Sequence, residues 1–159
     1  MQILIVYSTH HGCTEKCAGS LARQLAGDVR TVDLKKAKLP PLNQFETIII
    51  GGSIHAGRVQ QRITKFCNKN RDLLRSRRLG LFLCCMEEGD KAAEQFNQAF
   101  PDDLRAHATV KGFFGGEFNF NRMNWFEKAI IKKIAKIETS ISKIKEDEIT
   151  RFAKAIRST

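Results

Sequence analysis

The sequence predicts an α/β fold, a three-layer sandwich in which helices cover both faces of a five-stranded parallel sheet. Short continuous apolar runs alternate with amphipathic helical patterns along the chain. Continuous apolar runs are typical of parallel strands that are buried on both faces. The 159 residues suit one domain, so we expect a single domain over residues 1–159. Five strands in a chain of this length favour the order 2-1-3-4-5.

The expected elements follow from apolar spacing and from the residues that interrupt it. Strands are predicted for the short apolar runs at residues 3–7, 29–34, 47–50, 79–85 and 110–114. Helices are predicted where apolar residues recur every three or four positions, at residues 15–26, 59–69, 91–100, 125–137 and 146–156. Gly27 is placed to end the first helix, and Pro40-Pro41 exclude a regular helix before residue 45. About residues 115–145 lie between the last strand and the last helix and are an expected insertion.

The composition favours a cytoplasmic protein. No apolar run approaches the ~18–20 residues of a membrane span, and the N-terminus does not resemble a secretory signal. Five cysteines without a C-x-x-C pair predict reduced thiols. A metal site built from His10, His11, Cys13 and Cys17 is disfavoured, because Cys17 falls on the apolar stripe of a helix. We therefore expect no metal.

The charge is strongly basic. A net charge of +10 implies an acidic partner, an anionic lipid surface, nucleic acid or an anionic substrate. Residues 58–78 carry much of the excess, with Asp72 as their one acid. No groove-reading motif accompanies this charge, so nucleic acid is the least favoured of these partners.

The stretch Ser8-Thr9-His10-His11-Gly12-Cys13-Thr14 lies between the first strand and the first helix. Backbone N–H groups and the dipole at a helix start favour an anion, and the hydroxyls add donors. The stretch lacks the lysine of a nucleoside triphosphate loop and the glycines of a dinucleotide fingerprint. It therefore predicts a site for a single terminal phosphate held by neutral donors. The alternative is a polar turn whose serine and threonines only cap the helix.

Two segments carry a resemblance to a known family. S-T-H-H-G-C-T resembles the FMN phosphate loop of the flavodoxins, and I-I-I-G-G-S-I-H-A-G-R, residues 48–58, resembles their flavin loop. The second segment is closer still to the bacterial flavodoxin-type protoporphyrinogen oxidases. The resemblance implies a flavodoxin-like fold and an FMN cofactor, with residues 53–57 along the isoalloxazine and residues 84–90 closing its other side. It implies these cofactor-binding residues: Ser8, Thr9, His10, His11, Gly12, Cys13, Thr14, Ser53, Ile54, His55, Ala56, Gly57, Cys85, Met86, Glu87 and Gly89.

The chain departs from the flavodoxins in its aromatic residues. Its one Tyr, Tyr7, ends the first strand, and its one Trp, Trp125, lies in the insertion, so His55 or Met86 is expected to flank the flavin instead. An uncovered ring suits a flavin that meets a flat substrate directly. By its position, His55 is the candidate for proton transfer, although stacking or hydrogen bonding is the more common role of such a histidine.

The insertion combines aromatic and basic residues. Asn124 is placed to cap the helix at 125–137, whose apolar positions are Phe126, Ile130, Ile134 and Ile137 and whose cationic positions are Lys128, Lys132, Lys133 and Lys136. Such a helix can lie in a membrane interface, or its apolar stripe can pack on the domain. The resemblance implies a quinone acceptor, a porphyrin-type substrate and a peripheral position on the inner face of the membrane. The residues expected to cover the porphyrin are Phe118, Phe120, Arg122 and Trp125.

Two functional hypotheses follow. The first is an FMN-dependent oxidoreductase that passes electrons from a reduced organic substrate through flavin to a quinone or another acceptor. The alternative is an electron carrier that docks to a redox protein and has no substrate site; the basic charge disfavours it, because typical carriers of the family are acidic. The insertion distinguishes them, since a substrate or membrane role requires residues 115–145 to border the flavin.

Overall fold

The computed structural model describes residues 1–135 and 140–158. Its central sheet has five parallel strands in the spatial order β2-β1-β3-β5-β6, which is the predicted order 2-1-3-4-5 counted along these five strands. The strands are β1 (Gln2–Tyr7), β2 (Asp28–Asp33), β3 (Thr47–His55), β5 (Arg78–Cys84) and β6 (Val110–Phe113). A further two-residue strand, β4 (Arg58–Val59), pairs antiparallel with the end of β3 and was not predicted.

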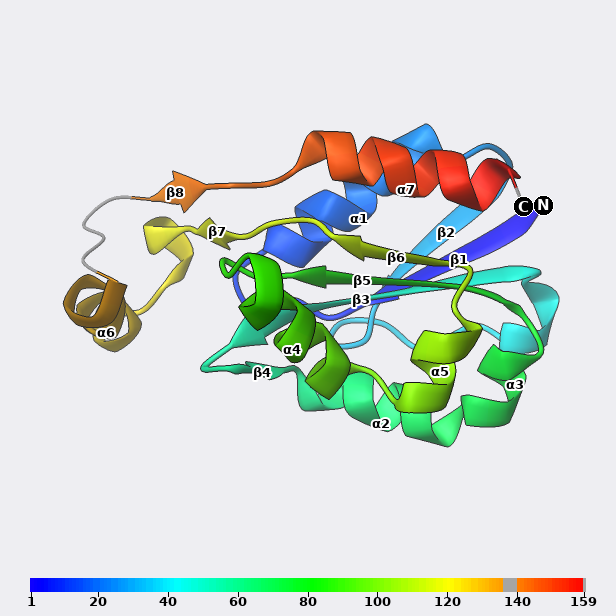
Figure 1. Cartoon of the computed structure of the whole chain (residues 1–159), viewed down its shortest axis with the longest axis horizontal. Helices are drawn as coiled ribbons and strands as arrows, with labels where there is room; N and C mark the ends of the chain where they lie inside the picture. The colour runs from blue at the N-terminus through cyan, green and yellow to red at the C-terminus, as the bar shows by residue number, and fades with distance from the viewer. Residues whose placement is uncertain (136–139, 159) are drawn as a thin grey trace.

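Helices cover both faces of the sheet, which confirms the three-layer arrangement (Figure 1). One face carries α1 (Cys13–Gln24) and α7 (Glu146–Ser158). The other face carries α2 (Gln61–Lys69), α3 (Arg71–Arg75), α4 (Gly89–Ala99) and α5 (Asp102–His107). A short 3₁₀ helix, η1 (Leu42–Gln44), precedes β3. Strand residues alternate between the two layers, so each face has its own apolar cluster.

The α1–α7 face has an aromatic centre. Phe82, Phe114 and Phe152 are fully buried, and the rings of Phe82 and Phe114 stack with centroids 4.5 Å apart. Phe152 of α7 meets Phe114 edge-on at 5.3 Å. This contact holds the last helix against the sheet beneath the carboxyl ends of the strands.

Several boundaries differ from the sequence prediction, and two short helices were not predicted. Strand β3 continues to His55 instead of ending at residue 50, because it pairs with β5 as far as Ser53 and then with β4. Helix α2 begins at Gln61 instead of residue 59, because Val59 pairs with Ile54 in the hairpin. The short helices α3 and α5 were not predicted, since neither is long enough to show a helical repeat.

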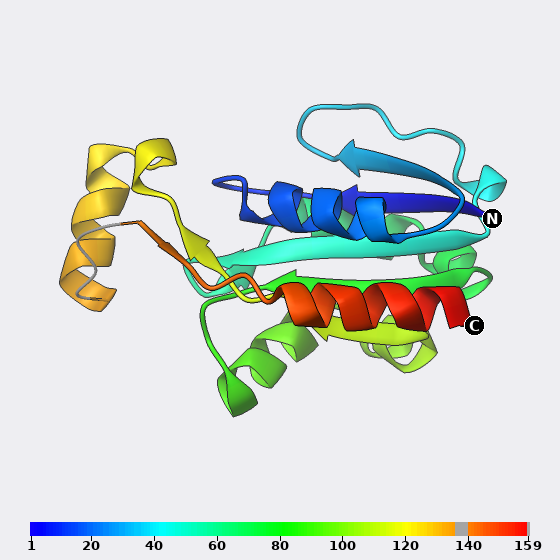
Figure 2. The ribbon, with the colours of Figure 1, turned by 90° about the horizontal axis from the view of Figure 1, so that it is seen from above.

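The predicted insertion is an arm that projects beyond the carboxyl ends of the strands (Figures 1 and 2). We call its described residues, 115–135 and 140–145, the arm. It contains β7 (Glu117–Phe118), η2 (Phe120–Arg122), α6 (Trp125–Ala135) and β8 (Ile141–Ser142), and β7 pairs antiparallel with β8. Asn124 caps α6 as predicted, accepting a hydrogen bond of 2.8 Å from the Glu127 N–H. Residues 136 and 137, the end of the predicted helix, lie outside the described residues.

Backbone bonds fasten the base of the arm to the sheet. The Cys85 N–H donates to the Gly115 carbonyl at 2.9 Å, and the Lys145 N–H donates to the Phe114 carbonyl at 2.9 Å. Within the described ranges, no helix is long and apolar enough to cross a bilayer.

Candidate functional site

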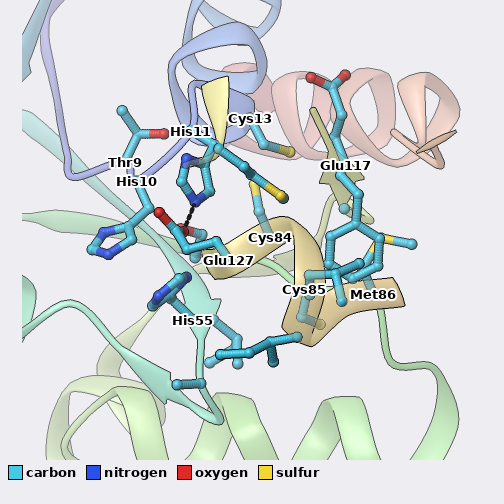
Figure 3. Close-up of a pocket in the computed structure, with 18 residues that line it drawn as sticks. Thr9, His10, His11, Cys13, His55, Cys84, Cys85, Met86, Glu117 and Glu127 are labelled. Atoms are coloured by element: carbon cyan, nitrogen blue, oxygen red, sulfur yellow. Dashed lines mark hydrogen bonds and ion pairs between the residues drawn. The ribbon is translucent and has the colours of Figure 1, made fainter. Parts of the chain in front are cut away.

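A cavity of about 290 Å³ lies where three strand-end loops meet the arm (Figure 3). In an open parallel sheet this edge is where ligands bind. The loops after β1, β3 and β5 form one side of the cavity, and the arm forms the other. The lining residues are Thr9, His10, His11, Cys13, Ser53, Ile54, His55, Ala56, Cys84, Cys85, Met86, Gly116, Glu117, Phe118, Met123, Glu127, Ile130 and Ile131.

The loop after β1 has the shape of an anion cradle. Gly12 lies in the left-handed region at φ 93° and directly precedes α1, and its N–H donates to the Thr9 hydroxyl oxygen at 2.9 Å. The first N–H groups of a helix have no partner within the helix. The Thr14 hydroxyl is fully buried in the first turn of α1 and has no hydrogen-bond partner among the described residues. An orphaned donor of this kind fits a bound oxyanion, because a buried polar group without a partner is costly.

The cradle is not neutral, contrary to the sequence prediction. The guanidinium of Arg122, from η2 of the arm, lies directly against Gly12, so that a Cβ at Gly12 would overlap with it. From its sequence position alone, Arg122 is expected to help cover a porphyrin substrate. The fold places it instead beside the first loop, where a cation strengthens the hydrogen bonding of a phosphate.

The loop after β3 is a two-residue hairpin turn. Ala56 and Gly57 both have positive φ, 49° and 76°, and His55 pairs with Arg58 across the turn. Positive φ at both central residues is the geometry that matches the twist of the flanking strands. A side-chain contact fixes Ser53, whose N–H donates a hydrogen bond of 3.0 Å to the Gln60 side-chain carbonyl. The hairpin therefore presents Ile54, His55 and Ala56 to the cavity from a fixed base.

The loop after β5 and the arm meet closely. A Cβ at Gly116 would lie 2.7 Å from Sδ of Met86 and 2.9 Å from the Cys85 carbonyl carbon, so only glycine permits this approach. Cys85 and Met86 line the cavity as predicted. Glu87 and Gly89 do not; they line a neighbouring hollow with Cys85.

The structure thus brings together most of the predicted site residues, but not all of them. Ten of the predicted residues line the cavity: Thr9, His10, His11, Cys13, Ser53, Ile54, His55, Ala56, Cys85 and Met86. Six predicted residues are outside its lining: Ser8, Gly12, Thr14, Gly57, Glu87 and Gly89. Ser8 is buried below the loop, where its N–H donates to the Gly51 carbonyl at 3.3 Å. Gly12 and Thr14 form the anion cradle beside the cavity, so they remain part of the candidate site.

Three histidines gather at the mouth of the cavity (Figure 3). The rings of His10 and His55 lie 3.9 Å apart between centroids, and His11 Nε2 lies 2.7 Å from Glu127 Oε2 of α6. Burial lowers the pKa of His10 below its usual value of 6.5, and the neighbouring His55 and His11 lower it further. The His11–Glu127 contact ties the arm to the first loop. His55 therefore lines the cavity, and the ring of His10, another residue expected at the site, lies beside it.

Two further groups of His, Cys and Glu side chains also converge. The donor atoms of His11, His55 and Glu127 lie within 4.8 Å of one another, as do the three sulfur atoms of Cys13, Cys17 and Cys84. All five cysteines of the chain are buried free thiols. Cys17 is on the apolar stripe of α1 as expected, but the fold brings Cys84 of β5 against it.

Sequence reasoning missed six lining residues: Gly116, Glu117, Met123, Glu127, Ile130 and Ile131. All six belong to the arm, and no sequence spacing shows where an arm folds back. Of the four residues expected to cover a porphyrin, only Phe118 lines the cavity; Phe120 is buried and Trp125 is 80% exposed.

The chain is similar in sequence to known proteins of one family. The sequence model of the flavodoxin domain family matches residues 4–144. The chain is 22% identical over 143 residues to the protoporphyrinogen IX dehydrogenase [quinone] of Leishmania major; the match covers 84% of this chain and 62% of that relative's length.

Solved structures show the same fold. The two-electron reduced flavodoxin of Megasphaera elsdenii matches with a TM-score of 0.61 at 14% identity, covering 99% of each chain. The flavodoxin of Streptococcus pneumoniae TIGR4 matches with a TM-score of 0.59, also at 14% identity and 99% coverage of each chain. With the family match over most of its length, the chain belongs to the flavodoxin domain family.

Proposed function

We propose that this protein is an FMN-dependent oxidoreductase similar to the flavodoxin-type protoporphyrinogen oxidases. It would pass electrons from a reduced organic substrate through flavin to a quinone or another acceptor. One observation carries the proposal: the arm borders the cavity in which the flavin ring is expected, with Phe118, Met123 and Ile130 among its lining residues. An electron carrier that only docks to a protein needs no such enclosure.

The residues present fit FMN. The orphaned Thr14 hydroxyl, the N-terminus of α1 and the Arg122 guanidinium together suit a phosphate monoester. The cavity volume of about 290 Å³ is close to that of the smallest ligand sites, about 300 Å³. It therefore suits a flat ring system whose polar tail lies outside the cavity. When bound, the flavin would supply the exchange of hydride or single electrons, while the protein supplies binding and orientation.

The chain's own residues would orient the ring and exclude water. The hairpin turn at Ala56 and Gly57 would lie along one edge of the ring, and the open space around Gly57 leaves its peptide free to turn toward it. His55 lines the cavity and would hold the ring by stacking or hydrogen bonding, and its imidazole would be the group that holds a proton there. Met86 and the apolar arm residues would shield the other side from water.

A flat, anionic substrate matches the remaining chemistry of the site. The cavity has apolar lining residues in Phe118 and Ile130, while the chain as a whole carries a net charge of +10. Such a combination favours a macrocycle with carboxylates at its edge. The resemblance of the chain to a protoporphyrinogen IX dehydrogenase supports a porphyrin-type substrate.

The same arm would hold the protein on a membrane. Trp125 and Phe126 are 80% and 59% exposed at the start of α6, and Lys128, Lys132 and Lys133 follow on the same helix. Exposed aromatics beside lysines are typical of helices that lie in a lipid interface. The test is co-sedimentation with anionic phospholipid vesicles, in which Trp125→Ser together with Phe126→Ser should abolish binding. Equal binding of the double variant would contradict a membrane position.

The function itself is tested by anaerobic mixing. FMN-loaded protein should be reduced rapidly by protoporphyrinogen IX and reoxidised by menaquinone, followed by the visible absorbance of the flavin. Failure of the apoprotein to bind FMN would contradict the assignment of FMN as the cofactor. FMN binding without a reaction with either compound would favour the electron carrier.

Matched variants sharpen this experiment. Phe118→Ala removes an apolar wall of the cavity and should slow flavin reduction about tenfold, the equivalent of roughly 1.4 kcal/mol. Leu39→Ala, which removes an exposed apolar side chain outside the cavity, is the control and should leave the rate unchanged. Identical rates in the two variants would argue against a substrate at the arm.

A further inference from the structure

Three cysteines from two elements converge beneath the first loop. Cys13 is the first residue of α1, Cys17 lies one turn further along the same helix, and Cys84 is the last residue of β5. Their sulfur atoms lie within 4.8 Å of one another, and each residue is less than 10% exposed. Cys13 and Cys84 also line the cavity (Figure 3), whereas Cys17 is not among its lining residues. The flavin chemistry proposed above uses none of these thiols.

Cys13 has the surroundings of a nucleophile. It opens a twelve-residue helix, whose N-terminal dipole favours a thiolate. The neighbouring Cys17 and Cys84 thiols lower the pKa of Cys13 by hydrogen bonding to its sulfur, against the opposing effect of burial. Cys67 in α2 shows the contrast, because burial raises its pKa to about 12. A small oxidant that enters the cavity therefore meets one reactive sulfur.

Helix geometry indicates which cysteine can form a disulfide with Cys13. Cys13 and Cys17 are four residues apart on one helix, where Cβ atoms are about 5–6 Å apart. A disulfide requires a Cβ–Cβ distance of about 3.5–4.5 Å, so the helix itself opposes a bond between these two. Cys84 is on a different element and shares the cavity wall with Cys13. Because Cys84 belongs to β5, a bond between Cys13 and Cys84 is not opposed by the residue spacing within α1.

We propose that Cys13 is a peroxide-sensitive modification site that forms a disulfide with Cys84. In the first step the Cys13 thiolate attacks hydrogen peroxide; an S–O bond forms, the O–O bond breaks and hydroxide leaves, so that sulfur is oxidised to a sulfenic acid and peroxide is reduced. In the second step the Cys84 sulfur attacks the sulfenic acid. The S–S bond forms, the S–O bond breaks, and the Cys84 proton leaves with the hydroxyl group as water. The product links the first loop to the end of β5.

The experiment uses the full-length apoprotein, so its result does not depend on flavin binding. The protein is treated with hydrogen peroxide, unfolded, and its thiols are counted; two of the five thiols should be lost and should return after treatment with dithiothreitol. Peptide mapping of the wild type should give a Cys13–Cys84 linkage. A linkage between any other pair, or the retention of all five thiols, would overturn the proposal.

Variants separate the roles of the individual cysteines. Cys84→Ala should trap the sulfenic acid on Cys13, detected as a dimedone adduct, and Cys13→Ala should lose no thiols to peroxide. Cys67→Ala removes a buried cysteine from α2 and is the matched control; it should lose two thiols like the wild type. Loss of two thiols from Cys13→Ala would contradict the assignment. The wild-type peptide map decides the question if a variant fails to fold.

Discussion

The sheet core and the arm use apolar residues in opposite ways. In the core, Phe82, Phe114 and Phe152 are completely buried and contact one another. In the arm, Trp125 and Phe126 are mostly exposed, although they are of similar size. Burial of large side chains is the main stabilisation of a fold, so the core residues contribute to folding. Trp125 and Phe126 do not, and exposed apolar side chains of this size are what the binding surface proposed above requires.

The attachment of the two regions differs as well. Core strands are joined by continuous ladders of backbone hydrogen bonds, from Gln2 paired with Asp28 to Leu83 paired with Phe113. The arm is held at its base by backbone bonds and further out by side-chain pairs such as Lys16–Glu117 at 2.7 Å. We therefore expect substitutions in the core to change stability, and substitutions in the arm to change binding.

The greatest loss of stability should come from a substitution in the core. Phe152→Ala should lower the free energy of unfolding by about 3–5 kcal/mol, because it leaves a cavity between α7 and the sheet. Trp125→Ala in the arm should change it by no more than about 0.5 kcal/mol. Urea denaturation followed by circular dichroism measures both. Equal losses in the two variants would mean that the arm is as much part of the folding core as α7.

The next effect concerns binding at the arm. Arg122→Ala should weaken FMN binding by about 1.5–3 kcal/mol, or roughly 10- to 150-fold, because a charged hydrogen bond to the phosphate is lost. Its unfolding midpoint should stay close to that of the wild type. Fluorescence titration of the apoprotein with FMN measures the affinity, and Arg30→Ala on β2 controls for the loss of one positive charge. An unchanged affinity would remove Arg122 from the phosphate site.

The third effect is a pH dependence where the two regions meet. Burial and the adjacent His55 and His11 lower the pKa of His10 below 6.5, so the unfolded chain takes up a proton before the folded one does. The free energy of unfolding of the apoprotein should therefore be highest above pH 6.5 and fall as the pH drops toward the lowered pKa. His10→Gln should flatten this decrease in a urea titration at several pH values. His107→Gln, at the far end of the sheet, controls for the loss of an imidazole, and an equal flattening there would contradict the prediction.

The smallest effect concerns a single link between arm and core. Lys16→Ala breaks the ion pair with Glu117, yet it should cost only about 0–1 kcal/mol, since the Lys16 side chain is 51% exposed. Faster amide hydrogen exchange confined to β7 and its neighbours is expected with little change in global stability. A global loss of several kcal/mol would show that arm and core unfold together.

Short sequence patterns predicted local structure well where the pattern is typical of a single kind of element. The run Ile3-Leu4-Ile5-Val6 predicted a strand covered on both faces, and all four side chains are fully buried. The hydroxyls and glycine of the first loop predict an anion site, and this stays a prediction; Gly12 has a positive φ there, and the Thr14 hydroxyl has no partner among the described residues. No local spacing could show that Arg122, more than a hundred residues away along the chain, lies against Gly12.

The sequence by itself determined the alternation of strands and helices, the strand order, the loops at the cavity and the existence of an insertion. These depend on side-chain periodicity and on short segments whose backbone requirements are local. Only the tertiary structure decided that the arm borders the cavity, that Arg122 meets Gly12 and that Cys84 joins Cys13 and Cys17. These contacts join residues that are distant along the chain. They depend on how whole helices and strands pack against one another, and the spacing of residues within one segment does not reveal that packing.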